Sequence, residues 1–132
     1  MTPHPLEAAR LLGTDAKAVQ ADRLAAAATL CTMSGAVVIL KGRNPIVAAP
    51  GHAPVIFDLA EPTLAVGGTG DVLAGIVGAF IAQGLTPRDA ALLGVYVHGQ
   101  AGVVSGMGNA QRGVFASEIA DAVPSVIAHL AR

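Results

Sequence analysis

A glycine-rich loop runs directly into a long apolar helix at Gly67-Gly68-Thr69-Gly70-Asp71-Val72-Leu73-Ala74-Gly75. Free N–H groups and the positive dipole end at a helix N-terminus attract phosphate, and glycine lets a phosphate approach the main chain. Asp71 taken alone is explained most simply as a helix N-cap. Next to four glycines, it is better interpreted as a base placed over a substrate at a phosphate-binding turn. The loop lacks the Walker lysine and the Rossmann glycine spacing, so it belongs to neither class.

The composition favours one compact domain whose surface is expected to contact other protein segments. The 132 residues suffice for a single core, and 53% of them are apolar while only 13% are charged. Such a chain is expected to cover its helices and strands on more than one side. The net charge of −1, without any basic run, argues against nucleic-acid binding.

The lone cysteine, Cys31, excludes a disulfide framework and a thiol metal cluster. A reducing cytoplasm is therefore the expected location. The first residues, Met1-Thr2-Pro3-His4-Pro5, lack the basic and apolar regions of a signal peptide. The longest apolar segments are too short or too interrupted to span a bilayer, so no membrane association is expected.

Periodicity and punctuation predict alternating helices and short strands. Gly13 and Gly35 follow two of the helical segments as stops, and Thr86-Pro87 forms a capped helix start. The apolar run 36–40 is predicted to be a strand buried on both faces. The expected helices are 6–12, 19–33, 70–83, one from 86 through 102, and 116–130, and the expected strands are 36–40, 45–49 and 55–59.

Lys41-Gly42 lies at the carboxyl end of the first strand, where ligands bind in open parallel sheets. For an isolated Lys-Gly pair, a solvated lysine in a turn is the better explanation. His98, in a very apolar helix, is interpreted as a hydrogen-bonded core residue, and His52 as a turn residue.

Several motifs together resemble one known family. The run GGTGDVLAGIVGAFIAQG, followed by the helix to HGQAG, closely resembles the carboxyl half of the ADP-dependent NAD(P)H-hydrate dehydratases, which are ribokinase-like. TPHPLEAARLL, LKG and the final ASEIADAVPSVIAHL resemble other landmarks of that family in the same order. The resemblance implies an α/β fold, a ribokinase-like α/β/α sandwich of which residues 1–132 hold only the carboxyl-terminal half. They would form a single partial domain with an incomplete central sheet.

The resemblance also implies an activity and a site. The activity is repair of NADHX or NADPHX, the hydrated nicotinamide cofactors, by removal of water at the expense of ADP or ATP, with Mg²⁺ as counter-ion. Asp71 would be catalytic and would also bind substrate, facing the hydroxyl that leaves, while His4 would contact the hydrated dinucleotide. The residues implied to bind the nucleotide are Lys41, Gly42, Arg43, Asn44, Pro45, Gly68, Thr69 and Gly70.

The residue types suit that chemistry. A hydroxyl is a poor leaving group, and phosphoryl transfer to it turns the elimination into expulsion of phosphate. Asp71 could accept the hydroxyl proton while the helix N-terminus stabilises charge on the moving phosphoryl group. No dedicated carboxylate cage for Mg²⁺ is visible in the sequence. Glu7 has two equally weighted explanations: it orients the TPHP turn, or it supports the first helical turn.

The chain departs from the family pattern in three places. Leu6 stands where the family usually has glycine after the TPHP turn, and Pro45 stands where it usually has threonine. Proline has neither a hydroxyl nor an N–H, so one polar contact to nucleotide is expected to be lost. Residues 58–63, before the glycines, are not the usual Asn- and Gly-rich loop.

The family domain is longer, and its amino-terminal half supplies further strands and substrate contacts. The chain alone would expose a sheet edge and apolar helix faces. We therefore expect a homo-oligomer or a partner chain that completes the domain, or else a misplaced start codon. Two other functions remain open: a ribokinase-like small-molecule kinase, and a catalytically silent nucleotide-binding or assembly module.

Overall fold

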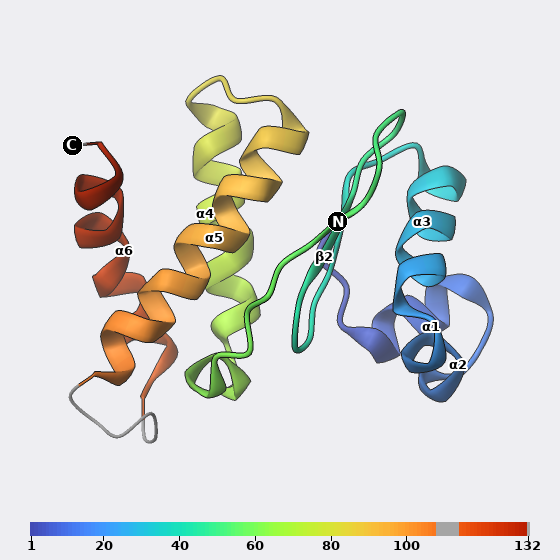
Figure 1. Ribbon diagram of the computed structural model, residues 1–132, viewed down its shortest axis with the longest axis horizontal. Coiled ribbons are helices and arrows are strands. Elements are labelled where there is room, and N and C mark those ends of the chain that lie inside the picture. The colour runs from blue at the N-terminus through green and yellow to red at the C-terminus, as the bar shows by residue number, and fades with distance from the viewer. Residues whose placement is uncertain (108–113, 132) are drawn as a thin grey trace. The chain divides into compact units, whose positions relative to one another are not determined.

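The chain forms two compact units, Met1–Leu59 and Ala60–Arg132, in a computed structural model that describes residues 1–107 and 114–131. Figure 1 shows helices together with a small sheet in the first unit, and the elements described in the second unit are helices. Each unit has its own set of packed apolar side chains. The expectation of one partial domain over residues 1–132 stays a prediction.

The first unit packs three helices against a three-stranded sheet, with α3 next to β1 and β2 and α1 next to α2 and α3. The first helix begins at Pro5, one residue before the predicted start. It ends at Leu12, before the predicted stop Gly13, whose φ of 67° is the left-handed conformation that glycine adopts easily. The elements are α1 (Pro5–Leu12), α2 (Ala16–Ala21), α3 (Arg23–Ser34), β1 (Val38–Leu40), β2 (Ile46–Ala48) and β3 (Val55–Ile56).

The sheet has the order β1-β2-β3, and both of these pairings are antiparallel. Val38 lies opposite Ala48 and Leu40 opposite Ile46, and these four belong to the same apolar cluster as the helices. The intervening residue of β1, Ile39, faces the other way and is also buried. The prediction of a strand buried on both faces is confirmed.

The first three residues lie along the other edge of β1. Ile39 donates its N–H to the carbonyl oxygen of Met1 (2.9 Å), and Lys41 donates to that of Pro3 (2.9 Å). Both partners advance by two residues in the same direction, so the two segments run parallel. Their carboxyl ends therefore lie side by side, which brings the TPHP turn next to Lys41-Gly42.

The helix predicted over 19–33 is in fact two helices, α2 and α3, separated at Asp22. The Asp22 backbone has a φ of −144° and a ψ of 80°, and its carboxylate accepts from the N–H of Ala25 (2.9 Å). Aspartate competes with helical hydrogen bonding and favours cap positions. The sequence did not predict this cap, because the alanines on both sides of Asp22 strongly favour an uninterrupted helix.

The second unit is a helical layer in which α5 contacts both α4 and α6 (Figure 1). Its core contains Ile76 and Phe80 from α4, Val97 from α5 and Ile119 from α6. The predicted start of α5 is confirmed, because the Thr86 side chain caps it and Pro87 is its first residue. The elements are the 3₁₀ helix η1 (Pro62–Ala65), α4 (Thr69–Ala82), α5 (Pro87–Gly106) and α6 (Ala116–Leu130).

The longest helix, α5, is buried over much of its length. His98 lies among its buried residues, as predicted for a core histidine. Gly94 and Gly102 provide close contacts with α4 and η1, respectively. Across the described ranges, none of the helices combines the length and the apolar character needed to cross a membrane.

Candidate functional site

The start of α4 combines a backbone donor, the Gly70 N–H, with one exposed carboxylate, while the N–H groups of Thr69 and Asp71 donate to Val66 (3.4 Å) and Gly68 (3.0 Å). Gly68 is the N-cap, with a φ of 90°, and no side chain caps this helix. The first intrahelical bond of the i to i−4 type runs from the N–H of Val72 to the Gly68 carbonyl (3.2 Å). The N–H of Gly70, within the first turn, has no acceptor inside the helix. This helix start therefore has the properties of an anion site.

Asp71 is the third residue of α4 and is exposed. It does not cap the helix, because the cap position belongs to Gly68 and the structure records no side-chain cap bond there. The simplest explanation of this aspartate from sequence is thereby wrong. Its carboxylate is exposed to solvent, and the residue follows Gly70 directly in the first turn.

Thr69 has a structural role in this loop. Its side chain is buried, and its hydroxyl lies 2.8 Å from the carbonyl oxygen of Leu64 and 3.0 Å from that of Val66. A hydroxyl has one proton to donate, so the two carbonyls share it. Thr69 therefore fastens α4 to η1, and its main-chain N–H also donates to the Val66 carbonyl (3.4 Å).

The TPHP turn is held by a reciprocal cap at the start of α1. The Glu7 N–H donates to His4 Nδ1 (3.1 Å), and the His4 N–H donates to Glu7 Oε2 (2.6 Å). The same carboxylate lies 3.8 Å from Lys41 Nζ, which arrives from the end of β1. Glu7 thus joins the two turns that the parallel pairing brings together, and both of its sequence explanations are correct.

The electrostatics of this cluster favour an ionised Glu7. The backbone hydrogen bond from His4 lowers the pKa of the Glu7 carboxyl below its ordinary value, and the positive charge of Lys41 lowers it further. Burial acts in the opposite direction and is outweighed. The imidazole of His4 is half-exposed, so a ligand can reach it.

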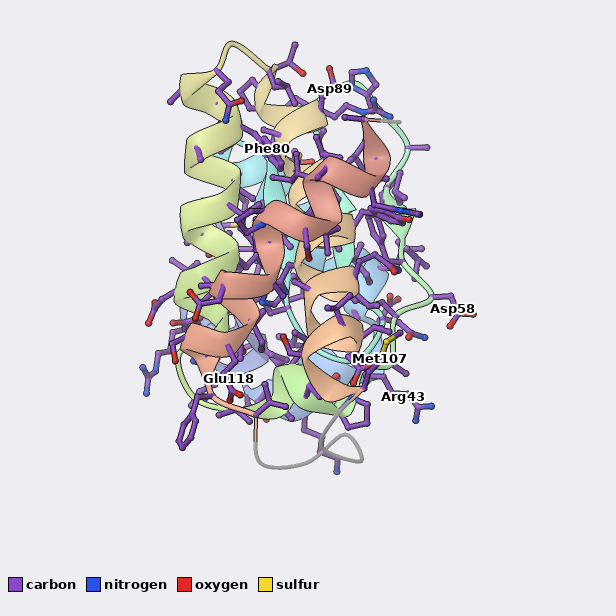
Figure 2. All side chains as sticks on the ribbon, turned by 90° about the vertical axis from the view of Figure 1, so that its left-hand side faces the viewer. Arg43, Asp58, Phe80, Asp89, Met107 and Glu118 are labelled. Atoms are coloured by element: carbon purple, nitrogen blue, oxygen red, sulfur yellow. The ribbon has the colours of Figure 1, made fainter. Side chains whose placement is uncertain are left out.

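The loop after β1 has an unusual backbone. Gly42 has a φ of 135° and Asn44 a φ of 55°, both in the range that favours glycine or asparagine. The Asn44 N–H donates to the Leu59 carbonyl (3.2 Å), and its side-chain Oδ1 accepts from the Leu59 N–H (3.3 Å). The Arg43 side chain is exposed and extends outward from the ribbon in Figure 2.

Pro45, which begins the return toward β2, accepts from the Phe57 N–H through its carbonyl (2.9 Å). Its ring adds no donor to the loop. Arg23, at the start of α3, contacts this loop through several main-chain carbonyl oxygens, and sequence reasoning missed it. Its partners are backbone atoms 17 to 21 residues away, which leave no trace in a side-chain pattern.

The predicted site residues fall into two groups. His4 and Lys41 through Pro45 gather in the first unit, and Gly68 through Asp71 form the helix start in the second. His52 is an exposed turn residue, as predicted, with Nδ1 2.9 Å from the Pro50 carbonyl oxygen. Within residues 1–107 and 114–131, no three His, Cys, Asp or Glu side chains gather to hold a metal ion.

Comparison with known sequences identifies a family. A sequence model described as NAD(P)H-hydrate dehydratase matches residues 1–125. The chain is 42% identical over 130 residues to a bifunctional NAD(P)H-hydrate repair enzyme of Moorella thermoacetica, covering 98% of this chain and 24% of that protein. It is 44% identical over 123 residues to an ADP-dependent (S)-NAD(P)H-hydrate dehydratase of Neisseria meningitidis, covering 92% of this chain and 42% of that protein.

Comparison with solved structures agrees. An ADP/ATP-dependent NAD(P)H-hydrate dehydratase from Bacillus subtilis, co-crystallised with ATP and Mg²⁺, superposes with a TM-score of 0.90 at 29% identity. The match covers 97% of this chain and 46% of that one. The fold is therefore ribokinase-like α/β, as predicted. The chain spans less than half the length of these matched proteins.

Proposed function

We propose, from the premise that this chain belongs to the NAD(P)H-hydrate dehydratase family, that it takes part in the ADP- or ATP-dependent conversion of NADHX or NADPHX back to NADH or NADPH. The reaction repairs a cofactor whose nicotinamide ring has gained water. The single observation that carries the proposal is the exposed carboxylate of Asp71 beside the uncapped start of α4. A base and an anion site are the two parts that phosphoryl transfer to a hydroxyl requires.

In the proposed reaction, the substrate hydroxyl oxygen attacks the terminal phosphorus of the nucleotide while Asp71 takes the hydroxyl proton. A new oxygen–phosphorus bond forms, and the bond to the nucleotide's bridging oxygen breaks. The resulting phosphate ester then loses inorganic phosphate with the help of the ring nitrogen's electron pair. Loss of a proton from the adjacent ring carbon forms the new carbon–carbon double bond and returns that pair to nitrogen. The sum is loss of water from the hydrate and cleavage of one phosphoanhydride bond.

The residues at the start of α4 fit a phosphate group. Gly70 offers a backbone N–H without an intrahelical acceptor, and Gly68 has no side chain to obstruct an approach. Gly68 also has little room for a side chain, because a Cβ there would lie 3.2 Å from the Ala116 Cβ. The positive end of the α4 dipole adds to the attraction for an anion.

Mg²⁺ suits a site of this kind through the nucleotide rather than through a protein cage. The ion demands six ligands and commonly takes them from phosphate oxygens and waters together with one or two carboxylates. Asp71 is the exposed carboxylate at this helix start. When bound, Mg²⁺ would neutralise charge on the phosphates during transfer.

We assign the first unit to recognition of the two nucleotides. His4 is proposed to contact the hydrated dinucleotide, and the loop from Lys41 to Pro45 to line the adenine-nucleotide site. Lys41 stands beside Glu7 with about a quarter of its side chain exposed, so its charge is oriented and still accessible. Arg43 is free to move toward a phosphate, because its side chain extends into solvent.

The assembly in which the site works is part of the proposal. We propose that a second copy, or another chain carrying the remaining part of the ribokinase-like domain, completes the sheet and the substrate contacts. Support comes from the exposed apolar side chains of both units, which include Met33, Met107 and Phe115. A reducing cytoplasm is the proposed location, because Cys31 is buried as a free thiol.

The decisive experiment incubates the purified chain with NADHX, Mg²⁺ and ADP or ATP, and follows the absorbance of NADH. Asp71→Asn should lower the rate about 10²–10⁴-fold, because a positioned base typically contributes that much. Its affinity for nucleotide, measured by calorimetry, should stay close to that of the wild type. Asp121→Asn, an exposed aspartate on α6, is the matched control and should leave the rate unchanged.

Other results of this experiment would select other functions. A phosphorylated product that accumulates without release of NADH would indicate a small-molecule kinase with the same aspartate and anion site. Nucleotide binding without consumption of the hydrate would indicate a catalytically silent nucleotide-binding module. An Asp71→Asn variant that turns over as fast as the wild type would contradict the assigned base.

A further inference from the structure

We propose that Arg23 is a positioning residue whose guanidinium holds the main chain of residues 40–44 so that the Gly42 N–H is presented to an anionic group of the adenine nucleotide. The nucleotide part of this inference rests on the proposed function. The part that concerns the loop itself rests only on contacts within the first unit.

The guanidinium lies inside a ring of main-chain carbonyl oxygens. Nη2 donates to Leu40 (3.3 Å) and Lys41 (3.2 Å), and Nη1 donates to Asn44 (3.2 Å) and also to Arg43. These four acceptors lie within the five consecutive residues 40–44, so the loop is wrapped around one side chain. Hydrogen bonds from a charged donor are roughly twice as strong as neutral ones.

Because of peptide geometry, a carbonyl that contacts Arg23 also determines the direction of the N–H of the next residue. In a trans peptide the C=O and the following N–H point in opposite directions. The Leu40 carbonyl faces Arg23, and the next N–H, of Lys41, is directed away to Pro3 (2.9 Å). The Arg43 carbonyl behaves in the same way, and the next N–H, of Asn44, reaches Leu59 (3.2 Å).

The third peptide in this series differs from the other two. The Lys41 carbonyl faces Arg23, so the Gly42 N–H is directed away from the guanidinium. In the described part of the chain no acceptor is found for this N–H, and Gly42 is exposed. Arg23 therefore leaves the Gly42 N–H as an outward donor on this loop, where an anion can be bound.

The backbone of the loop is adapted to this arrangement. A Cβ on Gly42 would lie 3.0 Å from Arg23 Nη2, and the φ of 135° is strained for any other residue. Asn44, with a φ of 55°, takes the left-handed conformation that asparagine tolerates best among side-chain-bearing residues. The loop thus has the residues that let it close around a guanidinium.

A positive charge is unfavourable at the position of Arg23, so we infer that the contacts with the loop are the reason for an arginine there. It is the first residue of α3, where the helix dipole disfavours a positive charge. Partial burial lowers the pKa of its guanidinium, although arginine remains charged in proteins. Lysine would keep the charge but lacks the planar fork that reaches several carbonyls at once.

The first test measures hydrogen–deuterium exchange of the full chain without any nucleotide. Arg23→Ala should raise exchange at least tenfold at residues 40–44 and leave peptides within α1 and α3 protected. Arg88→Ala, which removes a surface arginine paired with Asp89, is the control and should change nothing in the loop. Exchange in the loop that stays as slow as in the wild type would overturn the proposal.

Adding free guanidinium to the variant distinguishes loss of the guanidinium contacts from a general destabilisation of the fold. Millimolar guanidinium chloride should restore loop protection in Arg23→Ala, whereas sodium chloride at the same ionic strength should not. Failure of guanidinium to restore it would count against the proposal. If Arg23→Ala unfolds throughout, Arg23→Lys replaces it and should show the loop-specific increase, because its single ammonium cannot hold four carbonyls.

The second test measures binding of ATP with Mg²⁺ by calorimetry. Arg23→Ala and Arg23→Lys should bind about tenfold more weakly than the wild type or Arg88→Ala, an effect in the range of one lost charged hydrogen bond. Equal affinity in all four proteins would overturn the assignment to nucleotide. A wild type that fails to bind would contradict the proposed function, and the exchange experiment would still decide whether Arg23 holds the loop.

Discussion

Glu7 shows how much one half-exposed carboxylate organises at the residue scale. It closes the cap on α1 through the His4 N–H and stands 3.8 Å from Lys41 Nζ. Glu7 and Lys41, which lie in the two turns that it joins, are 34 residues apart in sequence (41 − 7). The catalytic proposal concerns Asp71, whereas Glu7 holds in place two residues that are proposed to bind nucleotides, His4 and Lys41.

Glu7→Gln keeps an oxygen acceptor for the His4 N–H but loses the negative charge, so it is expected to lower the free energy of unfolding by about 0.2–1 kcal/mol, the range of an exposed charged contact. The pKa of Glu7 is lowered in the folded state, so its stabilising contribution is complete above the unfolded value near 4.5. That contribution is lost as the pH falls through the folded value. Urea unfolding at several pH values should show the wild type and the variant converging in acid.

Glu118→Gln is the matched control for this prediction. Glu118 accepts from the Phe115 N–H (2.7 Å) at the start of α6, and no lysine pairs with it in the described residues. Lys41→Met should therefore couple to Glu7→Gln in a double-mutant cycle and not to Glu118→Gln. Equal coupling with both would show that the Glu7–Lys41 contact contributes nothing specific.

At the scale of elements, the close packing of α4 and α5 depends on Gly94. A Cβ at Gly94 would lie 2.6 Å from Val77 Cγ2 on α4, which is inside any tolerable contact. Gly78, on the same helix as Val77, has open space where its Cβ would be and is exposed. Of these two glycines in adjacent helices, Gly94 has no room for a side chain, whereas Gly78 has room for one.

Gly94→Ala is expected to destabilise the protein by about 1–3 kcal/mol, because the added methyl group overpacks the interface between α4 and α5. Gly78→Ala should instead stabilise it by about 0.5–1 kcal/mol, because alanine loses less backbone entropy in a helix. Thermal unfolding followed by circular dichroism measures both. A Gly94→Ala variant at least as stable as Gly78→Ala would show that the helices separate without cost.

At the scale of the whole molecule, the low share of charged residues is matched by exposed apolar side chains. Met107 is 77% exposed and Phe115 71%, in a chain of which only 13% is charged. Isolated exposed apolar residues are common, but a large share of them in a sparsely charged chain favours association. The ribokinase-like proteins that match this chain are also more than twice as long as the matched part.

The purified chain is therefore expected to form a defined oligomer, or to bind a separately expressed amino-terminal part of a family member. Light scattering coupled to size-exclusion chromatography gives the mass of the first, and co-elution detects the second. Activity of the kind proposed should follow the assembled fraction. A stable monomer with full activity would show that this chain needs no completion.

Much of the fold was predictable from local signals. The helix starts at Pro5 and Pro87, the glycine stop at Gly13 and the buried strand around Val38 depend on backbone preferences and on hydrophobic patterning. The break at Asp22 was missed, because alanine propensity on both sides outweighed a single capping side chain in the sequence pattern. The parallel-sheet argument for Lys41 holds only for the pairing with residues 1–3, since β1 and β2 are antiparallel.

The sequence by itself determined the family motif, the glycine-rich start of α4 and the identity of the residues proposed to bind and react. These properties lie in residue types and short spacings, which a linear chain displays. Tertiary structure alone decided that Asp71 is not a cap, that Glu7 bridges to Lys41, and that Arg23 holds residues 40–44. Each of these depends on where a carbonyl or an ammonium from a distant segment comes to lie. Every residue carries the same main-chain carbonyl, so only the folded backbone determines which group it contacts.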